Sequence, residues 1–209
     1  MVDPKSVPDE EIDTLIDPDL RQEIGNPCPV SFAATVVYTP LMIVGLIICA
    51  FFTKTIPPPG DMSRIGTDIG IGFAVAIGVV FVTFVLARMI PALQSMEVAF
   101  RRTLGPMSAG EIIRIALLSG IAEELLFRGA LQPWAGLIIT SVLFGILHFV
   151  PDKAWFPWTI FATGFGFLAG WLFESRGSLV APITAHVIVN LANLALIVSG
   201  RRLPITAAR

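Results

Sequence analysis

The chain has 209 residues, of which 55% are hydrophobic and only 14% charged, and its mean hydropathy is +0.79. A soluble domain carries about 25% charged residues, so this chain has too little polar surface to cover its apolar surface in water. Its net charge of −2 offers no basic surface to nucleic acid. The two cysteines, Cys28 and Cys49, are too few for a disulfide framework or a metal cluster. We therefore expect a membrane protein whose surroundings are the lipid bilayer.

The first 28 residues differ from the rest of the chain. They hold half of the acidic residues and are interrupted by prolines at positions 4, 8, 18 and 27. The stretch has neither the positive start nor the apolar core of a signal peptide. We predict a mobile, solvated tail over 1–28 with a short helical turn near 9–16, followed by a transmembrane domain over 29–209. A docking role for the tail is the alternative.

Six apolar segments follow, and a helix needs about 20 apolar residues to cross a hydrocarbon core of about 30 Å. A short interfacial helix over 94–104, with Glu97 and Arg101 four residues apart, separates the second from the third. Ser108 and Glu111 have capping-box spacing, which predicts that the third helix begins at residue 109. We expect an all-α, polytopic transmembrane helix bundle of about six spans, with a site between antiparallel core helices. The predicted spans are 30–52, 69–90, 109–132, 135–150, 157–173 and 179–199.

The loop charges and the tryptophans suggest how these spans are oriented. With six spans both termini share a side, and that side carries ten lysines and arginines against four on the other. The positive-inside rule then places both termini in the cytoplasm, and a bacterial inner membrane is the expected location. The four tryptophans fall near span ends, as in an aromatic belt. They are Trp134, Trp155, Trp158 and Trp171.

The third span contains three charged residues, which are costly inside a membrane and therefore indicate function. Glu124 and Arg128 are four residues apart and can pair along one helix face. Glu123 points about 100° away and has no cation at helical spacing. An unpaired carboxylate in an apolar site is a candidate general base. A purely structural Glu124–Arg128 pair is the alternative.

Both histidines of the chain also lie in predicted spans. His186 and Asn190 share one face of the sixth span. If the turn between the third and fourth spans centres near 135–136, Glu123 and His148 both lie about 18 Å from it and face each other. The alternative is that the histidines and Asn190, like Asn193, only hydrogen-bond neighbouring helices. We assign ordinary packing to Phe161, Phe165 and Phe167, and close helix approach to Ser119, Gly120, Gly129, Gly145, Gly164, Gly166 and Gly170.

Three motifs occur in order on separate apolar helices: Glu-Glu-x-x-x-Arg at 123–128, Phe-x-x-x-His at 144–148 and His-x-x-x-Asn at 186–190. Together with the local text EELLFRGALQ and LFGILHF, they resemble the CPBP family of CaaX-protease and bacteriocin-processing intramembrane glutamic endopeptidases. The resemblance covers about 108–195, and the first hundred residues carry no matching motif.

The resemblance implies the roles of the site residues. Glu123, assisted by His148, would activate water for peptide hydrolysis, while His186 and Asn190 would stabilise the oxyanion. Glu124 and Arg128 would orient the site. No cofactor is expected, and we favour a metal-free mechanism, although one glutamate and two histidines can ligate zinc.

The resemblance also suggests substrates without selecting one. Family members act on prenylated C-termini, bacteriocin leaders or C-terminal membrane anchors, so the expected substrate is a membrane-tethered protein or peptide. The polar run 151–153 after His148 suggests that water enters from the cytoplasmic side. A proton- or ion-coupled transporter and a non-catalytic immunity or scaffold protein are the alternatives. The residues do not specify an oligomeric state.

Overall fold

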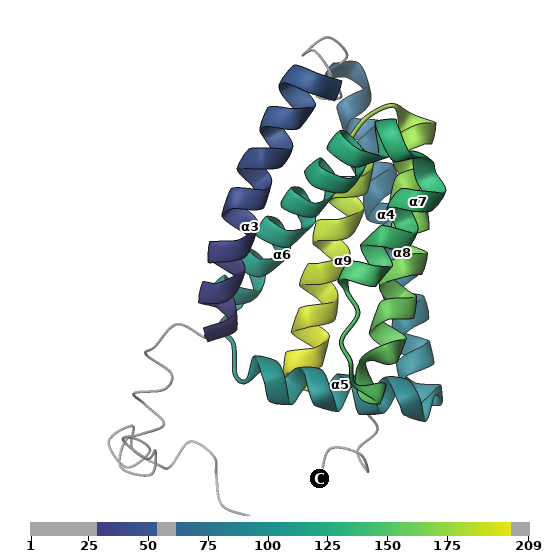
Figure 1. Ribbon diagram of the computed structural model, residues 1–209. Helices are drawn as coiled ribbons and strands as arrows, with labels where there is room; N and C mark the ends of the chain where they lie inside the picture. Colours follow the sequence, from purple (N-terminus) through teal and green to yellow (C-terminus); the bar gives the residue numbers. More distant parts are fainter. Residues whose placement is uncertain (1–28, 54–61, 202–209) are drawn as a thin grey trace, which may run out of the picture.

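The computed structural model describes residues 29–53 and 62–201. The predicted tail over 1–28 and its helical turn lie outside the described residues. Within the described ranges every regular element is a helix, as expected (Figure 1). In chain order these elements are α3 (Pro29–Ile48), the π-helical turn η1 (Cys49–Thr53), α4 (Met62–Met89), α5 (Pro91–Leu104), α6 (Ala109–Glu124), the π-helical turn η2 (Leu125–Leu131), α7 (Gln132–Leu147), the short 3-10 turn η3 (Lys153–Trp155), α8 (Phe156–Arg176) and α9 (Val180–Ser199).

The capping box at the start of α6 forms as the sequence predicts. The Glu111 backbone N–H donates to Ser108 Oγ at 3.3 Å, and the Ser108 backbone N–H donates to Glu111 Oε2 at 2.9 Å. These two bonds satisfy amides that would otherwise have no partner at a helix start. The preceding helix α5 ends at Gly105, whose φ of 65° is readily adopted by glycine. The boundary between the interfacial helix and the membrane-crossing helix α6 is therefore fixed by local chemistry.

The predicted third and fourth spans form one continuous helical run that doubles back at Gly136. This residue has φ 74° and ψ 170°, a conformation outside the helical region. We expected Pro133 to end the third span, but Pro133 falls within the first residues of α7, where a missing N–H is tolerated. α7 ends at Leu147, and residues 149–152 continue as irregular backbone. After the reversal at Gly136 only residues 137–147 remain helical, which is about half the length that a membrane-crossing helix needs. The fourth predicted span is therefore a half-length helix.

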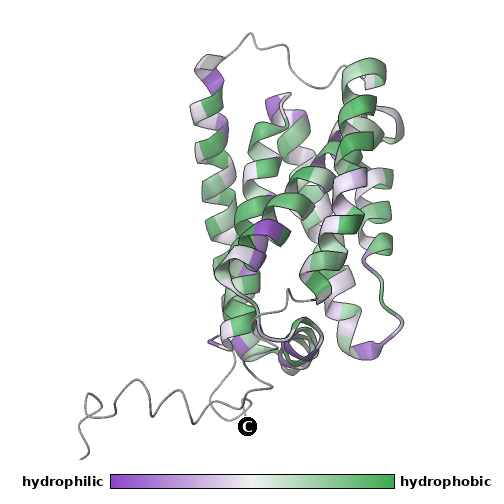
Figure 2. Ribbon diagram, turned by 90° about the vertical axis from the view of Figure 1, so that its left-hand side faces the viewer, coloured by the Kyte–Doolittle hydropathy of each residue, from purple (hydrophilic) through white to green (hydrophobic). Residues whose placement is uncertain are grey.

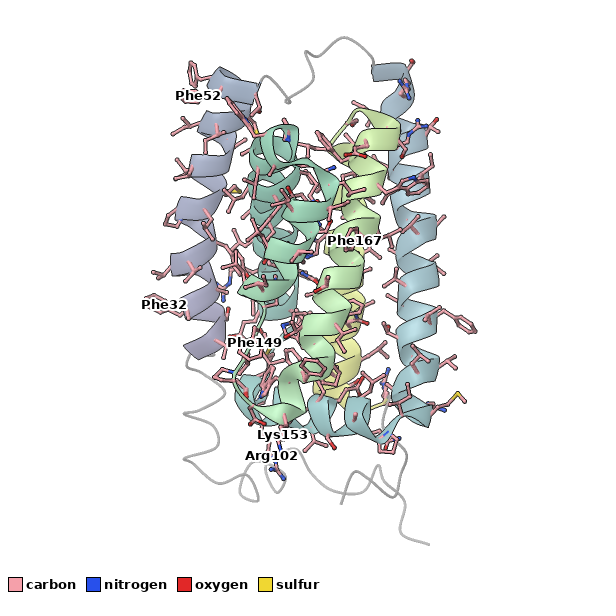
Figure 3. All side chains as sticks on the ribbon, turned by 45° about the vertical axis from the view of Figure 1, so that its right-hand side comes forward. Phe32, Phe52, Arg102, Phe149, Lys153 and Phe167 are labelled. Atoms are coloured by element: carbon pink, nitrogen blue, oxygen red, sulfur yellow. The ribbon has the colours of Figure 1, made fainter. Side chains whose placement is uncertain are left out.

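The described helices identify a multi-pass membrane protein. Five helical runs are long and apolar enough to cross a membrane, and one of them, Ala109–Leu147, contains the reversal. Hydrophobic residues predominate along the helices in Figure 2. Phe32 of α3 and Phe52 of η1 point outward in Figure 3 and are 65% and 68% exposed, as expected for side chains that face lipid. The start of α3 and the end of α9 lie on the same side of the bundle (Figure 1).

Helices α6 and α9 pack side by side in the middle of the bundle, with α3 against α6, α4 against α9 and α8 against α7 (Figure 1). Several of the glycines expected to allow close approach do so. A Cβ on Gly120 would lie 2.7 Å from Val187 Cγ2, and one on Gly166 would lie 3.1 Å from the Ser141 carbonyl oxygen. Gly145 and Gly170 are similarly close to Thr163 and Gln132. Gly164 has nothing within 4 Å, so our prediction for that residue is wrong.

Candidate active site

The two neighbouring glutamates of α6 are both buried, at 6% exposure for Glu123 and 0% for Glu124. Directly after them the helix widens into the π-helical turn η2. Short π-helical stretches inside α-helices are frequent at functional sites. This turn leaves backbone carbonyls available to the neighbouring helix: Leu125 O accepts from Cys49 Sγ at 3.3 Å, and Gly129 O accepts from Thr53 Oγ1 at 2.8 Å. These bonds hold the end of α3 and η1 against the segment that carries the site.

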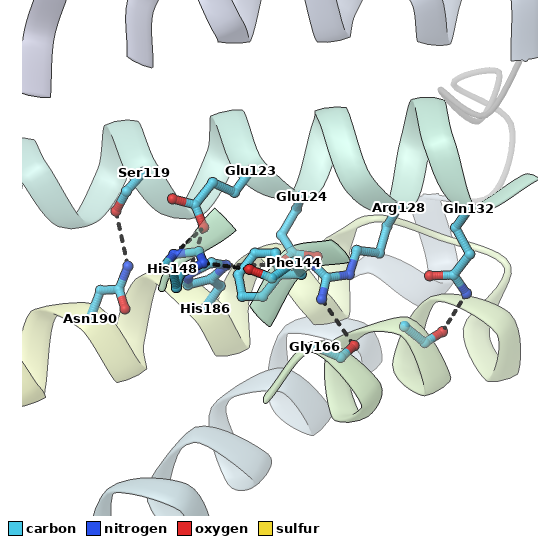
Figure 4. Close-up of polar contacts among 11 residues, drawn as sticks. Ser119, Glu123, Glu124, Arg128, Gln132, Phe144, His148, Gly166, His186 and Asn190 are labelled. Carbon is cyan, nitrogen blue, oxygen red and sulfur yellow. Dashed lines mark hydrogen bonds and ion pairs between the residues drawn. The ribbon is translucent and has the colours of Figure 1, made fainter. Parts of the chain in front are cut away.

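Glu124 is the centre of a buried charge network. Its Oε1 accepts from Arg128 Nη1 at 3.0 Å, which confirms the pairing expected from their spacing. The same oxygen is 2.7 Å from Nδ1 of His186, a contact that the sequence did not suggest. Arg128 Nη2 also donates to the Gly166 carbonyl oxygen at 2.9 Å (Figure 4). The network therefore links α6, α8 and α9 and fixes the orientation of the His186 ring.

Glu123, which directly precedes Glu124 in the chain, faces both histidines (Figure 4). Its Oε2 is 3.7 Å from Nε2 of His148 and 3.8 Å from Nε2 of His186. The reversal at Gly136 lies 13 residues after Glu123 and 12 residues before His148. The expectation that these two residues lie at matching depth is therefore confirmed. Both separations exceed an ordinary hydrogen bond, and a contact of this length suits a bridging water.

The orientation of His148 follows from its other ring nitrogen. Nδ1 is 2.7 Å from the Phe144 carbonyl oxygen, which can only accept, so Nδ1 carries the proton. In the neutral ring Nε2 is then an acceptor directed at Glu123. Two acceptors that face each other need a shared donor between them, and a water molecule can donate to both.

The two asparagines of α9 have different surroundings. Asn190 Nδ2 donates to Ser119 Oγ at 2.9 Å, and the second N–H of an amide group remains for another acceptor. Asn193 contacts Thr83 of α4, with Thr83 Oγ1 3.4 Å from its Oδ1, and so links two helices as expected. Ser119 was expected only to permit close helix approach, but it also holds the Asn190 amide.

A cavity of about 290 Å³ joins these groups. Its lining includes Glu123, His148, His186 and Asn190, together with apolar residues of α3, α5 and α8. The α5 residues and Ile197, near the end of α9, extend this lining towards the side on which α5 lies. Three further polar residues line the cavity: Ser119, Asn193 and Tyr38 of α3. Of these, Tyr38 was not among the residues singled out from the sequence. It is the only tyrosine in the chain, but its apolar helix gives no periodic signal that marks it.

Aromatic rings form one wall of the cavity. The Phe165 ring lies 4.8 Å from the His186 ring, and the Phe144 ring lies 4.5 Å from the His148 ring. Trp158 contacts His148 at 5.5 Å between ring centroids and lines the cavity, so it belongs to the site rather than to a lipid-facing belt. Phe161 also lines the cavity. Our assignment of Phe161 and Phe165 to ordinary packing was therefore incomplete.

Glutamate and histidine side chains are also common metal ligands. Among the described residues no three or more His, Cys, Asp or Glu side chains are arranged to hold a metal ion. Glu124 and both histidines already use one atom each on a protein partner. The metal-free mechanism remains a prediction that chelation can test.

Comparisons with known proteins point to the same part of the chain. Residues 105–192 match the family described as type II CAAX prenyl endopeptidase Rce1-like. The uncharacterized protein YpbD of Bacillus subtilis (strain 168) is 39% identical over 90 residues, which are 43% of this chain and 47% of YpbD. The match thus spans about half the length of that relative. No solved structure matches the chain.

The matched region begins just before α6 and ends just after Asn190, so it contains all six of the predicted site residues. The resemblance drawn from the three sequence motifs is thereby confirmed. Residues 105–192 of the chain are thus similar to the Rce1-like family of type II CAAX prenyl endopeptidases, within the CPBP group.

Proposed function

We propose that this protein is an intramembrane endopeptidase that hydrolyses a peptide bond of a membrane-tethered protein with water activated by Glu123 and His148. The observation that carries the proposal is the pair of facing acceptors, Glu123 Oε2 and His148 Nε2, 3.7 Å apart in a cavity. A water that donates to both directs its oxygen lone pair into the cavity. Similarity to the Rce1-like family supports the hydrolase class.

In the proposed reaction the water oxygen bonds to the scissile carbonyl carbon while Glu123 accepts one of its protons. The oxyanion that forms is stabilised by the free N–H of Asn190 and by Nε2–H of a protonated His186. Glu124 fixes the orientation of that ring, because its carboxylate lies 2.7 Å from Nδ1 of His186. The tetrahedral intermediate collapses as the C–N bond breaks, and the proton held by Glu123 moves to the departing nitrogen.

Removal of the base without change of shape tests this proposal. In proteoliposomes with a panel of membrane-tethered peptides, we expect the wild type to cleave and Glu123→Gln to lose at least about 10³-fold in rate. Glu174→Gln, at the far end of α8, is the matched acid-to-amide control and should cleave normally. Cleavage by Glu123→Gln at the wild-type rate would overturn the mechanism. No cleavage by the wild type, together with substrate-dependent ion flux, would favour a transporter instead.

We further propose that the protein resides in a bacterial inner membrane with both termini in the cytoplasm. The shared side of the described chain ends and the position of Arg102 and Lys153 on that same side (Figure 3) support this orientation. The cavity extends towards that side, and cytoplasmic water would enter there. Reporter fusions at residue 201 test the orientation, and an external reporter signal would overturn it.

A further inference from the structure

Helix α3 contributes one polar side chain to the cavity. Val30, Ala34 and Tyr38 are spaced four residues apart, so they form one stripe along the helix, and all three line the cavity. The rest of α3 presents large apolar side chains outward, among them Phe32 and Val36. A phenol in an apolar environment is costly unless its hydroxyl finds a partner.

The partner of Tyr38 is the carboxylate of Glu123, to which it makes a side-chain hydrogen bond. A neutral phenol can donate its proton, whereas an ionised carboxylate only accepts, so the bond runs from Tyr38 to Glu123. Glu123 is therefore approached from three helices besides its own: by Tyr38 from α3, by His148 from α7 and by His186 from α9. Glu124 and Arg128 are the charged groups nearby on its own helical run.

We infer that Tyr38 is a positioning residue of the site, which fixes the orientation of the Glu123 carboxylate. The inference rests on the proposed function, because it assigns Tyr38 a role in preparing the general base. The hydrogen bond from Tyr38 restrains rotation of that carboxylate. It also leaves Oε2, which has no hydrogen-bond partner within the described part of the chain, directed at the two histidines.

This assignment places part of the site outside the family match. The matched region begins at residue 105, whereas Tyr38 lies near the middle of α3. The bonds from Cys49 and Thr53 to η2 then acquire a function, since they hold α3 in register with the glutamates.

The first test does not require a substrate. Because Tyr38 is the only tyrosine, protein labelled with tyrosine carrying ¹³C at Cζ gives a single NMR signal, whose shift reports hydrogen bonding of the phenol. We expect this signal to move in Glu123→Gln and to stay in place in Glu174→Gln. An unchanged signal in Glu123→Gln would overturn the inference, and this outcome is independent of whether the protein cleaves peptides.

The second test measures catalysis by Tyr38→Phe, which removes only the hydroxyl. We expect kcat to fall about tenfold with KM little changed, because the base loses the hydrogen bond that orients it. Phe32→Leu, a lipid-facing change on the same helix, should leave both kcat and KM unchanged. A Tyr38→Phe variant with the kcat of the wild type would overturn the inference, and an unchanged melting temperature of Tyr38→Phe would show that the fold is retained.

Discussion

Replacement of Arg128 by methionine should strongly destabilise the protein. The guanidinium is 1% exposed and donates to Glu124 at 3.0 Å and to the Gly166 carbonyl at 2.9 Å. Its carbon also lies 4.6 Å from the centre of the Phe144 ring. Methionine fills much of the same volume but leaves a fully buried carboxylate without its cation. Breaking a buried pair in this way costs about 3–5 kcal/mol.

The assay is reversible denaturant unfolding of the purified protein in mixed micelles, followed by tryptophan fluorescence. Arg88→Met is the control, because Arg88 makes only an exposed hydrogen bond and a contact with Phe84, and the change should cost less than about 1 kcal/mol. The double variant Glu124→Gln/Arg128→Met removes both charges and should regain about half of the loss. The reasoning is refuted if Arg128→Met unfolds within 1 kcal/mol of the wild type, or if the double variant is less stable than Arg128→Met.

Three other predictions follow from single contacts. Gly72→Ala should destabilise by about 1–3 kcal/mol, because its Cβ would lie 2.5 Å from the Ala181 carbonyl oxygen, while Gly70→Ala, with nothing within 4 Å, should be neutral or stabilising in the same unfolding assay. Asn190→Ala should lower kcat by about 10²-fold with little change in KM, whereas Asn193→Ala should retain kcat; equal losses in the two variants would contradict the oxyanion role. Exhaustive chelation should leave peptide cleavage intact, and recovery of lost activity by added zinc would show that the metal-free mechanism is wrong.

Much of the fold was predictable because its signals are local. Apolar length placed the helices, and the Ser108–Glu111 spacing placed the start of α6. That Glu123 and His148 face each other was also predictable, because a helical hairpin places residues at equal distances from its turn at the same depth, and the turn lies near Gly136. These inferences need only distances along the chain.

The contacts missed from sequence depend on which helices become neighbours. The bond between His186 and Glu124 joins residues 62 apart in sequence, and nothing in either segment specifies the pairing. Tyr38 lies in a helix that is apolar on every face, so periodicity cannot show which side is buried. The early end of α7 at Leu147 was missed because Phe149 and Val150 are as apolar as the rest of the predicted span.

Because α7 is short, it ends beside Glu123 in the interior of the bundle rather than at a membrane surface. The last carbonyls of a helix have no partner within it, and in lipid such groups are costly. Here Phe144 O accepts from the His148 ring, and His148 O is 3.4 Å from Thr159 Oγ1. The Gly145 and Ile146 carbonyl oxygens accept from the backbone N–H groups of His148 and Phe149, each at 3.0 Å. The bond from the His148 ring to Phe144 O thus both closes the end of the interrupted helix and turns Nε2 of that ring towards Glu123.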